Sequence, residues 1–174
     1  MPLFRQVVEC QPALPGRYRY RLRVRLGDGP ALAIILKNPS LADGERLDPT
    51  VGKVEAWARR NGFGAVSYLN LFAYRSPYPA ALEAVDYATA VGPENDAALL
   101  SAHQQADLVV VAWGNPNGIA VTRYACRIKE VLALLTNGAE RPLFQVGDRT
   151  QAGYPRHGLH WNGEVSLRPF ALVR

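Results

Sequence analysis

Residues 17–26 alternate strictly between basic and apolar side chains, a pattern that predicts a β-strand. Every odd position from Arg17 to Arg25 is arginine, and the even positions are tyrosine, leucine or valine. Because successive side chains of a strand point to opposite faces, one face would be apolar and the other wholly basic. The glycines of residues 27–29 then predict a hairpin turn into the apolar run 31–37.

The rest of the chain alternates continuous apolar runs with stretches of helical periodicity. The apolar runs, typical of strands buried on both faces, cover residues 31–37, 64–73, 108–113 and 142–146. Helical patterns cover residues 49–61, 94–105 and 119–135. Asp48 is suited to cap the first helix, with Pro49 at its first position. We therefore predict a three-layer α/β/α sandwich with a central, mostly parallel sheet and an N-terminal antiparallel β-ribbon.

Length and composition are those of one α/β domain spanning residues 1–174. With 174 residues and 48% hydrophobic side chains, the chain is long enough to bury a core without metal or disulfide bonds. Its two cysteines, Cys10 and Cys126, are too few for a disulfide framework or a cysteine-rich metal site. No apolar stretch approaches signal-peptide or membrane-span length. We therefore expect a cytoplasmic protein with no cofactor, no membrane insertion and no obligate protein partner.

The formal net charge of +5 raises the question of where the basic side chains lie. Only three of the 20 basic residues are lysine, and the fork of donors on arginine suits phosphate groups and base edges. The alternating strand supplies five candidate nucleic-acid contacts: Arg17, Arg19, Arg21, Arg23 and Arg25. The alternative for this strand is a solvated sheet face that binds nothing.

Loops at the carboxyl ends of the parallel strands are the predicted ligand site, because open α/β sheets bind ligands there. The candidate residues in these loops and beside them are Asn38, Pro39, Ser40, Asp43, Asp48, Asn70, Arg75, Asn95, Trp113, Gly114, Arg156 and His157. Asn70 stands in an apolar run, where an amide needs hydrogen-bond partners and its donor and acceptor suit the edge of a base. Gly114 would let another group approach the backbone, and His157 would stabilise a developing anion.

Each of these residues also has a structural interpretation. Asn38, Ser40 and Asp48 are common in turns and caps, and Asn95 is suited to a helix start. Trp113 fits the apolar core equally well.

Several motifs, in their order and spacing, resemble a family of small bacterial and phage proteins. These are Leu-Lys-Asn38-Pro39-Ser40-Leu-Ala-Asp43, Asp48-Pro49-Thr50, Asn70-Leu71-Phe72-Ala-Tyr-Arg75, Gly92-Pro93-Glu94-Asn95-Asp96, Ala-Trp113-Gly114 and Pro155-Arg156-His157. They are similar to the domain of unknown function family numbered 1643, over roughly residues 17–160. This resemblance implies almost nothing about function.

A more distant resemblance does imply a function. The strand ends Asn38-Pro39, Leu69-Asn70, Trp113-Gly114 and Arg156-His157 are similar, in order, to those of the uracil-DNA glycosylase superfamily. The resemblance implies that Asn38 orients an attacking water, that Asn70 reads a flipped pyrimidine and that His157 stabilises the departing base. It implies hydrolysis of a modified base from DNA or a nucleotide.

Three functions therefore stay open. The leading hypothesis is a nucleic-acid-directed N-glycosidase of this kind. The second is a non-catalytic module that binds a nucleotide or nucleic acid in the same pocket. The third is a metal-dependent phosphoesterase that uses Asp43, Asp48, Asp96 and His157, although their spacing matches no metal motif.

Overall fold

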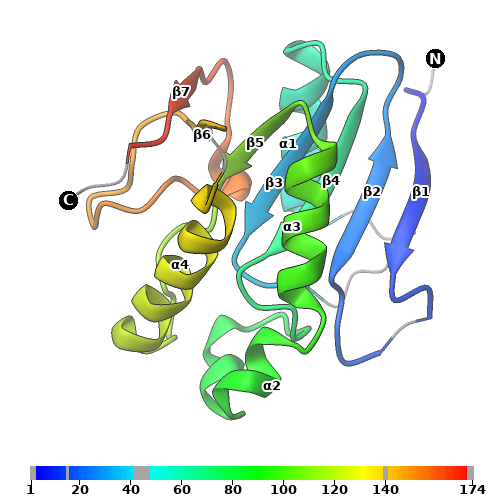
Figure 1. The fold of residues 1–174 in the computed structure, drawn as a ribbon. Coiled ribbons are helices and arrows are strands. Elements are labelled where there is room, and N and C mark those ends of the chain that lie inside the picture. Colours follow the sequence, from blue (N-terminus) through cyan, green and yellow to red (C-terminus); the bar gives the residue numbers. More distant parts are fainter. Residues whose placement is uncertain (1–2, 15, 41–47, 139–140, 172–174) are drawn as a thin grey trace.

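The computed structural model describes residues 3–14, 16–40, 48–138 and 141–171, which form one mixed sheet covered by helices (Figure 1). The strands are β1 (Gln6–Gln11), β2 (Arg21–Arg25), β3 (Ala31–Leu36), β4 (Ala65–Asn70), β5 (Leu108–Val111), β6 (Leu143–Val146) and β7 (Leu167–Pro169). The α-helices are α1 (Pro49–Arg60), α2 (Tyr87–Val91), α3 (Asn95–Gln105) and α4 (Val121–Thr136). Two short 3-10 helices, η1 (Pro79–Glu83) and η2 (Gly158–His160), complete the described elements.

The centre of the sheet is parallel, as the apolar runs predict. The strand order is β1-β2-β4-β3-β5-β6-β7, and β3 pairs in parallel with both β4 and β5. β6 continues the parallel part beside β5. Antiparallel strands close both edges, with β1 and β2 at one edge and β7 at the other. The α/β architecture with an N-terminal antiparallel pair is confirmed, and β1 and β7 are additions that the sequence pattern did not indicate.

Helices cover both faces of the sheet and divide the core in two. α1 lies behind the sheet in Figure 1, where its Trp57 packs edge-on against Trp161. α3 and α4 lie in front and bury Leu99, Val131 and Leu135. The predicted start of α1 is confirmed, because the carboxylate of Asp48 accepts a hydrogen bond from the Val51 amide at 2.8 Å.

The predicted hairpin between β2 and β3 is wrong. β4 lies between these strands, and β2 pairs with β4 in antiparallel fashion, Leu22 opposite Tyr68. The glycines of the turn pack against the chain that enters β4, and a Cβ at Gly64 would lie 2.6 Å from the Gly29 nitrogen. The turn therefore spans β4 instead of closing a two-stranded hairpin, and the ribbon pairs β2 with β1.

The order of strands creates a crevice at one end of the sheet. From β3 the chain passes through α1 to β4 on one side, then crosses back to β5 and β6 on the other side. The connections that leave β3 and β5 therefore diverge, which is the point where open α/β sheets bind ligands. Within the described residues, no helix is both long enough and apolar enough to span a membrane.

Candidate functional site

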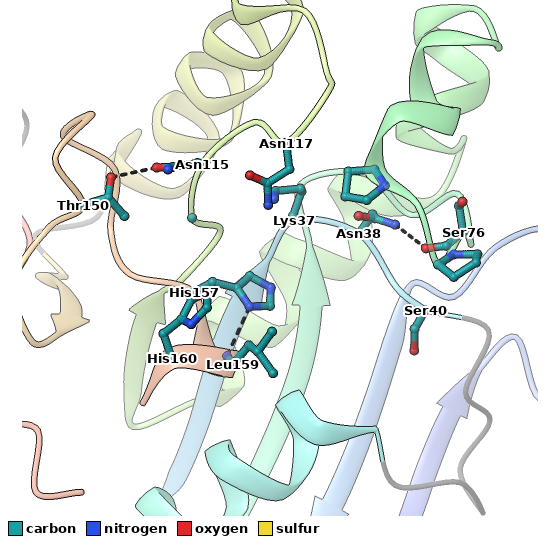
Figure 2. A pocket seen from close by; sticks show the side chains of 13 residues that line it. Lys37, Asn38, Ser40, Ser76, Asn115, Asn117, Thr150, His157, Leu159 and His160 are labelled. Carbon is teal, nitrogen blue, oxygen red and sulfur yellow. Dashed lines mark hydrogen bonds between the residues drawn. The ribbon is translucent and has the colours of Figure 1, made fainter. Parts of the chain in front are cut away.

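A cavity of about 300 Å³ lies beyond the carboxyl ends of β3 and β5. Its lining comes from four segments far apart in the sequence, and Figure 2 shows them converging. The lining residues are Lys37, Asn38, Ser40, Ser76, Pro77, Pro79, Gly114, Asn115, Asn117, Thr150, His157, Leu159 and His160. All but the leucine, the two prolines and the glycine carry polar or basic side chains, and none of these described residues is acidic.

Asn38 follows β3 and has a fixed orientation. Its Nδ2 donates a hydrogen bond to the carbonyl oxygen of Ser76 at 2.8 Å and a longer one to that of Pro39 at 3.4 Å. Because both partners are acceptors, the nitrogen must point toward them. The amide oxygen is thereby turned toward the cavity (Figure 2), where it can accept a hydrogen bond from a ligand or a water.

His157 projects into the same cavity from the segment after β6 (Figure 2). Its Nδ1 accepts a hydrogen bond from the Leu159 amide at 3.2 Å, so in the neutral ring the proton is on Nε2. Burial lowers the pKa of His157 to about 4, assisted by the positive charges of Lys37 and His160 and opposed by Asp48. At neutral pH His157 is therefore an uncharged hydrogen-bond donor.

Gly114 makes room for His157. It has a φ of +67°, and a Cβ built on it would lie 2.9 Å from the Cβ of His157. Its amide donates a hydrogen bond to the carbonyl oxygen of Pro155 at 3.0 Å, which ties the two loops together. The close approach expected at Gly114 is thus made by the histidine of the neighbouring loop.

Lys37 is a lining residue that the sequence patterns did not indicate. Only 4% of it is exposed, and burial lowers the pKa of its ammonium to about 8. Within the described part of the chain it forms neither a hydrogen bond nor an ion pair through Nζ. The available signal was a charged residue at the end of the apolar run 31–36, directly before Asn38.

The hydroxyl and carboxylate groups near Asn38 form hydrogen bonds that stabilise the loop and the start of α1. Ser40 Oγ donates to Asp48 Oδ2 at 2.9 Å, while Asp48 Oδ1 caps α1. The amide of Ser76 donates to the carbonyl oxygen of Pro39 at 3.0 Å, and Arg75 Nε donates to that of Ser40 at 3.4 Å. These contacts agree with the turn-and-cap interpretation. Predicted site residue Asp43 lies outside the described residues.

Other predicted site residues lie outside the lining of this cavity. Asn70 is 1% exposed, and its side-chain nitrogen and oxygen have no hydrogen-bond partner among the described residues. Asn95 Nδ2 donates to the carbonyl oxygens of Asn70 and Leu71, at 3.1 and 3.0 Å. Trp113 is fully buried in the core and Arg156 is half-buried. The structure therefore brings Asn38 and His157 to the same cavity, while the buried side chain of Asn70 does not line it.

The alternating strand expected over residues 17–26 is confirmed only for β2, and its basic face is partly buried. The strand covers only Arg21–Arg25, and both Arg19 and Arg21 are buried. Arg21 donates to Gln105 of α3 at 2.9 Å and to Ser67 of β4 at 3.1 Å. This face of β2 lies on the side covered by α3, which explains the burial.

The remaining arginines of that stretch are more accessible. Arg17 is exposed, Arg23 is half-buried, and Arg25 is exposed and paired with Asp28 at 3.1 Å. Nucleic-acid contact through these three side chains stays a prediction.

The metal-dependent alternative gains no support from the described residues. Asp48 uses both carboxylate oxygens within the loop, and Asp96 forms an ion pair with Arg127 of α4 at 2.7 Å. In the described ranges, no three histidine, cysteine or acidic side chains lie close enough together to hold a metal ion.

Comparison with known proteins identifies a family. A family model described as "Protein of unknown function (DUF1643)" matches residues 19–159, most of the chain. No curated protein and no solved structure matches. The resemblance to the uracil-DNA glycosylase superfamily therefore stays a prediction.

Proposed function

The chain belongs to the DUF1643 family of proteins of unknown function, and we propose that it hydrolyses an N-glycosidic bond in the cavity lined by Asn38 and His157. The observation that carries this proposal is that two side chains 119 positions apart (157 minus 38) reach the same cavity. They are the pair to which the resemblance to the glycosylases gives the catalytic roles.

The neutral state of His157 suits the departure of a base. As the bond between the anomeric carbon and the base nitrogen breaks, the electron pair goes to the base and the sugar gains oxocarbenium character. Nε2–H of His157 faces the cavity and can donate a hydrogen bond to the negative charge that develops on the base. A fixed donor in a site of low dielectric stabilises such charge more than water does.

Asn38 suits the placement of the attacking water. Its amide oxygen is turned toward the cavity by the two hydrogen bonds of its nitrogen. A water held by this oxygen would add to the anomeric carbon, release a proton to solvent and leave the sugar with a hydroxyl. The departing base then takes up a proton from solvent.

The test is release of free base from nucleosides, nucleotides and DNA duplexes that carry uracil, hypoxanthine or a mismatch. We expect release by the wild type, and a fall of about 10²–10³ in rate for His157→Ala, the range seen when one oxyanion donor is removed. Asn38→Ala should lose the placed water and slow release as well.

Asn137→Ala is the matched control for Asn38→Ala, because Asn137 is exposed at the end of α4. It should release base at the wild-type rate. If the wild type releases no base from any of these substrates, the proposed hydrolysis is wrong.

A non-catalytic binding module is the second candidate, and one observation favours it. The described lining contains no carboxylate that would take a proton from water. Binding of a nucleotide that depends on Asn38, without release of base, would establish this function instead.

A further inference from the structure

Lys37 is a buried cation whose charge the described protein leaves uncompensated. It is 4% exposed, lines the cavity, and has no hydrogen bond or ion pair at Nζ within the described ranges. Burying an ammonium without a partner is costly unless an anion accompanies it. The side chain is therefore suited to an anion that enters the cavity with the ligand.

The titratable groups around Lys37 strengthen this conclusion. His157 comes from the segment after β6, and His160 lines the cavity from η2. The described carboxylate that acts on His157 is Asp48, whose two oxygens already accept from Ser40 and Val51. No described carboxylate acts on the pKa of Lys37, which burial lowers.

Most other polar groups of the cavity already have partners within the protein. Ser40 Oγ donates to Asp48, Ser76 Oγ donates to the carbonyl oxygen of Tyr78 at 2.9 Å, and Thr150 Oγ1 donates to Asn115 at 2.7 Å. Lys37 and the Nε2–H of His157 are donors that face the cavity, together with the side-chain amides of Asn115 and Asn117. Two donors in one cavity can serve two ligand groups, the base at His157 and an anionic group at Lys37.

We propose that Lys37 binds the phosphate of a nucleoside monophosphate, so that the substrate class of the cavity is a free mononucleotide. That the ligand contains a sugar and a base rests on the proposed function. That it contains a phosphate rests on Lys37.

One observation favours a mononucleotide over a nucleic-acid strand. The cavity volume of about 300 Å³ admits a single nucleotide, whether it is free or flipped out of a strand. A strand would also need a basic track along the surface, and Arg19 and Arg21 are buried in the fold instead of forming one.

The experiment measures binding by calorimetry with four probes: inorganic phosphate, 2′-deoxyuridine, its 5′-monophosphate, and a single-stranded oligonucleotide of deoxyuridine. We expect wild type to bind phosphate, and to bind the monophosphate more tightly than the nucleoside. Lys37→Met should lower the affinity for phosphate and for the monophosphate by about tenfold or more, the loss expected for one charge-assisted hydrogen bond. Nucleoside binding should change much less than phosphate binding does.

Lys129→Met is the matched control, because it removes the same charge from an exposed position on α4. It should bind every probe as wild type does. A second measurement needs no variant: near pH 8.5, phosphate binding should take up a proton, because an anion beside Lys37 raises its pKa. Calorimetry in two buffers of different ionisation enthalpy detects this uptake.

The outcomes separate the two proposals. If wild type does not bind phosphate, or if Lys37→Met binds it as tightly as wild type, the phosphate site is wrong even where base is released. If the oligonucleotide binds more tightly than the monophosphate, the choice of a free mononucleotide is wrong. If phosphate binding depends on Lys37 but the protein releases base from none of the substrates, the phosphate site is confirmed and the proposed hydrolysis is wrong.

Discussion

Two buried cations near the same end of the sheet, Arg127 and Lys37, are held in opposite ways. Arg127 is 1% exposed, and its Nε donates to the carbonyl oxygen of Leu71 at 2.6 Å. Its other nitrogens form ion pairs with Asp96 at 2.7 Å and Glu130 at 3.3 Å. Lys37 is almost as buried, yet its Nζ contacts no described acceptor.

The difference distinguishes a cation that stabilises the fold from one that serves a ligand. The partners of Arg127 offset the cost of burial, and they connect α3 and α4 to the end of β4. In Lys37 no described partner offsets the free-energy cost of burying the charge, and this burial lowers the pKa of the ammonium to about 8. Uncompensated burial of this kind is common where a ligand completes the site.

The largest expected effect is loss of stability when Arg127 is removed. Arg127→Ala deletes a fully buried side chain together with its hydrogen bond to Leu71 and both ion pairs. We expect the free energy of unfolding to fall by about 3–5 kcal/mol, measured by urea titration. Arg25→Ala, which removes an exposed ion pair, should cost less than about 1 kcal/mol. If both changes lowered the free energy of unfolding equally, the buried contacts of Arg127 would contribute no more than an exposed ion pair.

Removal of Lys37 should change the free energy of unfolding in the opposite direction. At pH 7 the lysine is protonated in both the folded and the unfolded chain, so the folded state bears the full cost of its burial. Lys37→Met should therefore raise the free energy of unfolding by about 3 kcal/mol.

The pH dependence of this gain tests its cause. Between pH 8 and 10.5 the folded state releases the proton of Lys37 before the unfolded state does, so the wild type gains stability. The advantage of Lys37→Met should shrink across that window. A constant advantage would assign the gain to packing instead of charge.

Gly114→Ala should damage the site more selectively. A non-glycine residue in the left-handed region costs about 1–2 kcal/mol, and the new Cβ would press on His157 at 2.9 Å. We expect a moderate fall in unfolding free energy together with a large fall in base release. Gly153→Ala is the control, because Gly153 also has a positive φ but nothing within 4 Å of its Cβ position. If both variants release base equally, the Gly114–His157 contact is unimportant.

The smallest expected effect links the two basic groups of the cavity. The charge of Lys37 helps to lower the pKa of His157, although burial is the larger cause. Lys37→Met should therefore raise the pKa of His157 modestly, by less than about one unit, followed by NMR titration of the imidazole. An unchanged pKa would show that the two groups do not interact.

The local patterns predicted the fold better than they predicted the site. Continuous apolar runs identified β3 to β6, and Asp48 with Pro49 marked the start of α1, because these signals arise within a few residues. The pairing of β2 with β4 was missed, since it depends on which strand fills the place beside the turn. The burial of Arg21 was missed for a related reason: its partner Gln105 lies 84 residues away.

At the site, the rule that ligands bind at the carboxyl ends of parallel strands predicted Asn38 and His157, because the loops that follow these strands meet at one edge of the sheet. The same rule grouped Asn70 with them, but its side chain is buried and is not among the residues that line the cavity. Lys37 was missed because a lysine after an apolar strand has the same sequence signature whether it reaches solvent or bends into a cavity.

The hydrogen bond between Gly114 and Pro155 has a consequence for folding. The walls of the cavity come from residues near 37 and near 157, and this bond holds the loop with His157 against the loop that follows β5. Contacts between residues so distant in sequence require the loss of chain entropy to be met before they are gained. We therefore expect ligand binding in the cavity to report the fully folded chain.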